Sequence, residues 1–213
     1  MPLVKTISPC LDCNIHLWTL EEEEDYFVNA MAWDNKQLIW LQSLHPVKRL
    51  EYMASRYLIY RFAGIEEEHL YKDEAGKLYL RKSQHHVSVS HSDPWIGISL
   101  AKFNMGFDVQ VCKPKIETIA NRFLSEGERR MLSTLKLFTP EDLCLCWAAK
   151  EAIYKHHGKK GIDFARQIRL DFSMEEAGHV SIHAILQTSE LINNYHIHYE
   201  KNKDFVWALA VGV

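Results

Sequence analysis

The sequence predicts an α+β protein with two α+β halves, residues 1–103 and 104–213. Hydrophobic residues at helical spacing precede runs of alternating residues, and this order of helices and strands occurs twice along the chain. A length of 213 residues suits one domain or two small ones. No literal sequence repeat is visible, so the predicted doubling depends on the order of elements alone.

Strands and helices are expected to open the first half. Two alternating runs indicate strands, a capping box formed by Thr19 and Glu22 then indicates a first helix, and hydrophobic residues at helical spacing indicate a second. The second of these helices has Pro46 at its first position and is followed by Gly64, which suits a helix end. The predicted ranges are 2–7 and 14–20 for the strands and about 20–33 and 46–63 for the helices.

Between residues 70 and 111 the hydrophobic period changes to two, which predicts a small antiparallel sheet. Turn-forming residues such as Asp93 and Pro94 separate its runs. The strand runs are 77–80, 87–90, 95–101 and 105–111.

The second half is predicted to repeat this order. Its clearest helix covers residues 140–157, because Thr139 suits the N-cap, Pro140 the first position and Gly158 the end. Two shorter helices and three alternating runs accompany it. The helices are expected at 115–121 and 126–137, and the strands near 165–172, 179–186 and 195–213.

The composition is that of an ordinary globular protein, with 47% hydrophobic and 25% charged residues. Because 25 basic and 28 acidic residues give a net charge of −3, the charge does not predict a nucleic-acid partner. The sequence shows neither a signal-peptide pattern nor an apolar run long enough to cross a membrane. We therefore expect a cytoplasmic protein with no membrane partner.

The 5 cysteines lack the spacing of a disulfide framework, and we interpret them as free thiols. Cys10 and Cys13 form a CxxC pair that could begin a zinc or redox site. There is no second such pair, and no His pair follows Cys13 at the distance of a zinc finger, so a structural role is favoured.

The first candidate site lies in the run Gly106-Phe107-Asp108-Val109-Gln110. On a strand, Asp108 and Gln110 point to the same face, which places two oxygen ligands side by side above an apolar layer. An Asp after Gly can equally be a turn or edge residue. Taken alone, this run is weak support for a metal site.

The second candidate lies on the helix predicted over 140–157. Trp147, Glu151 and Lys155 are four residues apart and therefore form one line along it. A surface Glu–Lys pair is the simpler interpretation. However, a carboxylate and an ammonium beside a Trp on a partly apolar face are costly to bury without partners.

Two further patterns indicate phosphate binding. Ser90 and His91 are adjacent on a predicted strand and point to opposite faces, so they cannot form a hydrolase pair, and hydrogen bonding to a phosphate is the better functional interpretation. Arg49 and Arg56, seven residues apart, share one helix face, with Lys77 as a third basic arm. Exposed arginines on a helix can also be merely solvated.

Together these residues resemble a known family. Ser90-His91-Ser92, then the run from Gly106 to Gln110, then the run from Trp147 to Lys155 occur in the order and at the spacing of 4'-phosphopantetheinyl transferases of the surfactin-synthetase-activating type. The resemblance covers most of the chain, since the arginine helix and the Gly76-Lys77 turn also match. A single motif would be weak, but the ordered set is specific.

The resemblance implies a pseudo-dimer of two similar α+β halves, with the active site in the cleft between them. Such an enzyme moves the phosphopantetheine arm of coenzyme A to a serine hydroxyl of an apo acyl or peptidyl carrier protein and releases adenosine 3',5'-bisphosphate. Mg²⁺ assists, with Mn²⁺ as the alternative. Residues 1–103 would then hold the nucleotide and residues 104–213 the metal and the catalytic helix. We expect a monomer, because one chain already makes the cleft.

The resemblance also assigns roles to residues. It implies a metal held by Asp108, Gln110 and Glu151, and a diphosphate contacted by Lys155. It implies catalytic roles for Glu151 and Lys155, with Glu128 as a second candidate base, although Ser125 and Glu128 also match a capping box. The residues that would bind coenzyme A are Arg49, Arg56, Lys77, Ser90, His91 and Lys155.

The chain departs from the family pattern at two positions. Gln110 stands where Glu is commonest, which removes one negative charge from the metal site, and Leu78 follows Lys77 where many relatives have Pro. Gln110 motivates one alternative function, a coenzyme A-binding protein with weakened catalysis. A Mg²⁺-dependent hydrolase of coenzyme A is the other, since the same metal and lysine could activate water.

Overall fold

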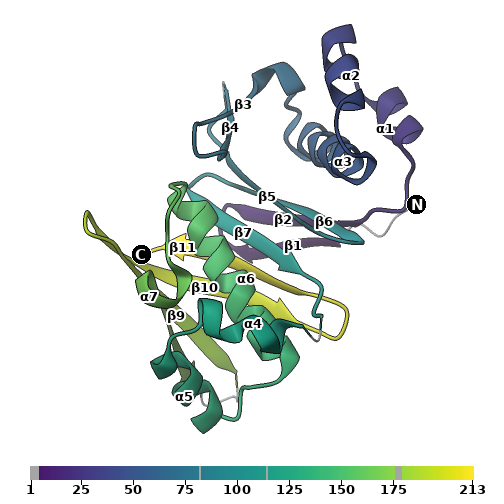
Figure 1. Ribbon diagram of the computed structural model, residues 1–213. Helices are drawn as coiled ribbons and strands as arrows, with labels where there is room; N and C mark the ends of the chain where they lie inside the picture. The colour runs from purple at the N-terminus through teal and green to yellow at the C-terminus, as the bar shows by residue number, and fades with distance from the viewer. Residues whose placement is uncertain (1–4, 82, 114, 176–178) are drawn as a thin grey trace.

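The computed structural model describes residues 5–81, 83–113, 115–175 and 179–213. The protein is α+β, as expected, and within these ranges all the strand pairs are antiparallel. The larger sheets have the strand orders β1-β2-β6-β5 and β7-β11-β10-β9-β8, and β3 and β4 form a separate ribbon (Figure 1).

The chain up to Ala101 forms the four-stranded sheet, the ribbon and three helices (Figure 1). The strands are β1 (Lys5–Cys10), β2 (Cys13–Thr19), β3 (Leu70–Lys72), β4 (Leu78–Leu80), β5 (His86–Ser92) and β6 (Trp95–Ala101). The helices are α1 (Glu24–Ala30), α2 (Asn35–Gln42) and α3 (Pro46–Ala63), with a 3₁₀ turn at Glu67–His69.

The chain from Met105 forms the five-stranded sheet and its helices. The strands are β7 (Met105–Gln110), β8 (Ile168–Met174), β9 (Val180–Gln187), β10 (Ile192–Lys201) and β11 (Val206–Gly212). The helices are α4 (Ile116–Phe123), α5 (Glu126–Thr134), α6 (Pro140–His157) and α7 (Phe164–Gln167).

Three hydrophobic clusters hold these elements in layers. One face of the four-stranded sheet packs against α3, through side chains such as Ile98 and Leu58. Its other face packs against β7 and β11, where Leu17 lies in one cluster with Phe107. The far face of the five-stranded sheet packs against α4 and α6. The two sheets are therefore stacked between two groups of helices.

Several expected elements differ from the structure. Helix α1 begins at Glu24, later than the expected start near residue 20, and α2 was not expected at all. The run 195–213 contains two strands, β10 and β11, with a turn between them. The alternating runs between 70 and 111 do not share one sheet, because β7 pairs with β11. Part of the first expected strand, residues 2–4, lies outside the described residues.

Gly106 permits the contact that positions the candidate site. A Cβ atom at this position would lie 1.8 Å from the backbone oxygen of Ala152, so only glycine lets β7 lie directly on α6. This contact brings residue 108 of β7 beside residue 155 of α6.

Across the described ranges, no helix has both the length and the apolar character that crossing a bilayer requires.

Candidate active site

Asp108 lies at the centre of a polar cluster where β5, β7 and α6 meet. Its side chain is buried, with 2% of the residue exposed. Oδ1 accepts hydrogen bonds from Ser90 Oγ at 2.6 Å and from Lys155 Nζ at 2.7 Å. Oδ2 accepts one from Gln110 Nε2 at 2.8 Å. These contacts bring together four residues that the sequence assigned to the site.

Lys155 connects the two sheets as well as neutralising Asp108. Its Nζ donates to the backbone oxygens of Val89 on β5 and Phe107 on β7, both at 3.1 Å. The side chain keeps 27% exposure and lines a pocket of about 480 Å³. The ammonium group therefore has a fixed position at the edge of a solvent-accessible cavity.

Glu151 lies one helical turn before Lys155, on the same side of α6. Burial, together with the negative charge of Asp108, raises the pKa of Glu151 to about 7, although Lys155 opposes this effect. Two carboxylates thus face one lysine, and the site has an excess of negative charge when both are ionised. A cation here would relieve that excess.

The donors present fit a hard divalent ion. Mg²⁺ prefers one or two carboxylates together with phosphate oxygens and water, and Asp108 and Glu151 supply the carboxylates. Gln110 lies beside Asp108, as the strand pattern predicted, but its amide nitrogen points at the carboxylate. Within the described ranges, no three His, Cys, Asp or Glu side chains form a ready-made metal cluster. Phosphate or water oxygens would have to complete the coordination shell.

This pocket of about 480 Å³ lies between α3, the β3–β4 ribbon, β5 and the end of α6. Of the residues predicted to bind coenzyme A, it is lined by Arg56, Lys77, His91 and Lys155. Two further lysines, Lys48 and Lys72, also line it, and neither was predicted from the sequence. Lys48 could have been proposed from its spacing alone, because it lies on the same helix as Arg56, seven residues before Ser55 and eight before Arg56. So many basic side chains make this pocket suitable for an anion.

Two of these basic groups are held by neighbours. Arg56 is buried, forms an ion pair with Glu67 at 2.6 Å and lies over the ring of Tyr52. Lys77 Nζ donates to Asn104 Oδ1 at 2.7 Å and to the backbone oxygen of His156 at 2.6 Å. Burial lowers the pKa of Lys77. Lys77 thus anchors the β3–β4 ribbon to the end of α6.

Arg49 has a different position from Arg56. It pairs with Glu24 of α1 at 2.8 Å and is not among the residues that line the pocket. The expected helix face is therefore split, with Arg56 at the pocket and Arg49 at the contact between α3 and α1.

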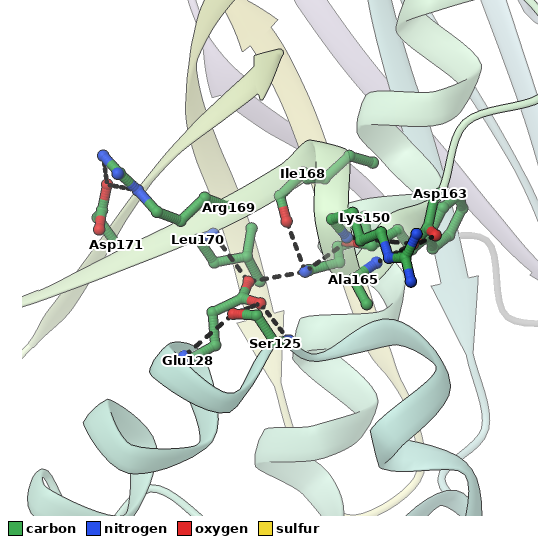
Figure 2. A network of polar contacts seen from close by, with 11 residues as sticks. Ser125, Glu128, Lys150, Asp163, Ala165, Ile168, Arg169, Leu170 and Asp171 are labelled. Carbon is green, nitrogen blue, oxygen red and sulfur yellow. Dashed lines mark hydrogen bonds and ion pairs between the residues drawn. The ribbon is translucent and has the colours of Figure 1, made fainter. Parts of the chain in front are cut away.

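Glu128 also lies away from the pocket, in a buried network with Lys150 (Figure 2). Oε2 accepts from Ser125 N and Oγ, which is the capping box that the sequence predicted. Oε1 lies 2.7 Å from Lys150 Nζ and accepts from Leu170 N at 3.0 Å. Both carboxylate oxygens are engaged and the residue is 2% exposed, so the structure does not bring Glu128 to the other site residues.

Comparison with known proteins agrees with this geometry. The family model of the 4'-phosphopantetheinyl transferase superfamily matches residues 104–210, half of the chain, and this range contains β7 and α6 with Asp108, Glu151 and Lys155. A search of curated proteins finds no match. On the strength of the family match, the chain belongs to the 4'-phosphopantetheinyl transferase superfamily.

Proposed function

We propose that the protein transfers the 4'-phosphopantetheine arm of coenzyme A to a serine hydroxyl of an apo acyl or peptidyl carrier protein, as enzymes of the surfactin-synthetase-activating type do. One observation carries the proposal: the basic pocket meets the Asp108–Glu151 carboxylate pair at Lys155. A polyanionic nucleotide in the pocket would then place its diphosphate beside the carboxylates. The pocket volume of about 480 Å³ lies in the range of small-molecule sites.

The basic residues of the pocket would hold the nucleotide end of coenzyme A. Arg56, Lys77 and His91 are the predicted contacts, and Lys48 and Lys72 add to them. Because such contacts exist equally in the ground state and the transition state, they contribute to affinity more than to kcat. Ser90 has a different role, because its hydroxyl donates a hydrogen bond to Asp108 and so fixes the position of that carboxylate.

Asp108 and Glu151 would hold Mg²⁺, with Mn²⁺ as the alternative, and the ion would neutralise charge on the phosphate oxygens. Lys155 adds a fixed positive charge at the same place, 2.7 Å from Asp108. The serine oxygen forms a new bond to the β-phosphorus, and the bond from that phosphorus to the bridging oxygen breaks. Adenosine 3',5'-bisphosphate leaves with this oxygen, and the serine proton passes to solvent or a nearby base. Lys155 favours the departure because charge accumulates on the leaving oxygens.

We also propose the division of the chain at residue 104 into a nucleotide-binding half and a metal-binding half of a pseudo-dimer. The stacking of the two sheets supports this division, since Lys155 hydrogen-bonds to a strand of each. A monomer in the cytoplasm remains our expectation from the sequence.

The proposal is tested by incubating the protein and Mg²⁺ with coenzyme A alone and then with an apo carrier protein. We expect turnover only with the carrier, seen by mass spectrometry as one added phosphopantetheine and by chromatography as adenosine 3',5'-bisphosphate. Turnover without carrier would indicate the hydrolase, and binding without turnover would indicate the coenzyme A-binding protein. Lys155→Met serves as the matched inactive variant.

A further inference from the structure

A carboxylate lies among the basic residues of the phosphate pocket. Glu51 of α3 lines this pocket, and its side chain is 14% exposed. Oε2 accepts a hydrogen bond from Lys48 Nζ at 2.8 Å, and Oε1 lies 3.3 Å from His91 Nδ1. A negative charge here repels an incoming phosphate, so Glu51 favours phosphate binding only through an effect that outweighs this repulsion.

We infer that Glu51 is a positioning residue that orients the ring of His91 and favours the imidazolium form, which can donate to a bound phosphate. The inference rests on the proposed function and deepens it. Because Nδ1 is the ring nitrogen that lies 3.3 Å from Glu51 Oε1, Nε2 is the one left to reach a ligand. A neutral ring that keeps its proton on Nδ1 would present a lone pair at Nε2 and repel a phosphate. Only the doubly protonated ring donates on both sides.

The charges around His91 show why it needs this carboxylate. Burial lowers the pKa of His91, and the charges of Lys48 on α3 and Lys155 on α6 lower it further. Glu51 on α3 and Asp108 on β7 raise it, and Glu51 has the larger effect of the two. Asp108 is already neutralised by Lys155 at 2.7 Å. Glu51 is therefore the main group that favours the protonated ring.

The opposite hypothesis is that Glu51 blocks the pocket by occupying Lys48 and His91 until phosphate displaces it. The two hypotheses predict opposite signs for Glu51→Gln, which keeps the size of the side chain and removes its charge. If Glu51 positions His91, coenzyme A binds more weakly to the variant. If Glu51 blocks the pocket, coenzyme A binds more tightly.

Isothermal titration calorimetry with coenzyme A at pH 7 provides the first test. We expect Glu51→Gln to raise the Kd about fivefold, the effect of losing one partly exposed ion pair. The same substitution in a His91→Gln background should have little further effect, because the two residues act as one unit. Glu68→Gln is the matched control, since Glu68 pairs with His69 at 3.5 Å and lies outside this pocket. An unchanged or lower Kd in Glu51→Gln, or additive effects in the double variant, would overturn the inference.

A second test needs no ligand. The pKa of His91 is measured by NMR titration of the imidazole signals, assigned by their loss in His91→Gln. We expect Glu51→Gln to lower this pKa and Glu68→Gln to leave it unchanged, and an unchanged value in Glu51→Gln would overturn the inference. If the wild-type protein fails to bind coenzyme A, the proposed function fails separately, and the titration still decides the role of Glu51.

Discussion

Replacing Glu128 with Gln should destabilise the fold and leave the chemistry of each folded molecule intact. Lys150 is 0% exposed, and Glu128 is the carboxylate that faces its ammonium group at 2.7 Å (Figure 2). The other contacts of Lys150 Nζ are the backbone oxygens of Phe164 at 2.9 Å and Ile168 at 2.7 Å. In Glu128→Gln these neutral acceptors would remain, but the buried ammonium group would have lost its negatively charged partner.

The expected loss of stability is about 3–5 kcal/mol, the usual cost of breaking a buried ion pair from one side. The part of this loss that comes from the unpaired ammonium charge is limited, because Lys150 can lose its proton. Deprotonating an amine with an ordinary pKa near 10.4 costs about 4.6 kcal/mol at pH 7. Burial already lowers the pKa of Lys150 while Glu128 opposes this effect, so the variant moves the pKa further down.

Urea unfolding followed by tryptophan fluorescence measures this loss. With a slope of about 2 kcal/mol per molar urea, the midpoint should fall by about 2 M. The double variant Glu128→Leu with Lys150→Met should recover most of the stability, because two apolar side chains can replace a buried pair. A loss below about 1 kcal/mol, together with abolished transfer by folded Glu128→Gln, would refute the reasoning and make Glu128 the catalytic base.

The remaining predictions concern the metal site and acid stability. Asp108→Asn and Glu151→Gln should each lower transfer at least about 100-fold in a steady-state assay, and near-normal turnover at limiting Mg²⁺ would contradict the metal assignment. Gln110→Glu should lower the Mg²⁺ concentration for half-maximal activity, whereas an activation curve shared with wild type would place Gln110 outside the reach of the metal. Burial lowers the pKa of His16 to about 4. Unfolded histidine takes up its proton near pH 6.5, whereas the folded residue does so only near pH 4. The free energy of unfolding should therefore fall by roughly 3 kcal/mol as the pH is lowered from 6.5 to 4. His16→Leu should flatten this part of the thermal-unfolding profile, and an unchanged slope would contradict the assignment.

Local signals predicted the helices that carry the site. Helices α3 and α6 have the expected bounds, 46–63 and 140–157, because proline at the start and glycine after the end act within one turn. Helix α2 was missed although Asp34 and Gln37 form a capping box that the sequence already contains. The partner of β7 could not be predicted in the same way. Its pairing with β11 joins residues about 100 positions apart, and no local pattern encodes such a choice.

The site was predicted only in part, because local patterns do not show which residues distant in the sequence come together. Asp108 and Lys155 were chosen from motifs, and the structure brings them within 2.7 Å of one another. Glu51 was missed because its partner His91 lies on a strand of another layer, which helical spacing cannot reveal. Arg49 and Arg56 share a helix face in the sequence, but Glu24 on a neighbouring helix holds Arg49 away from the pocket.

Gln110 shows how a departure from the family pattern can follow from the charge balance of the cluster. Without a cation, Asp108 has one full positive partner, Lys155, and Glu151 already carries a pKa raised to about 7. A third carboxylate at position 110 would lie next to Oδ2 of Asp108, where the amide of Gln110 now donates a hydrogen bond at 2.8 Å. Glutamine therefore stabilises the cation-free cluster, whereas glutamate would need the ion to offset its repulsion. Because an ion stabilises a fold to the extent that it binds the native state alone, Mg²⁺ should raise the melting temperature of Gln110→Glu more than that of the natural protein.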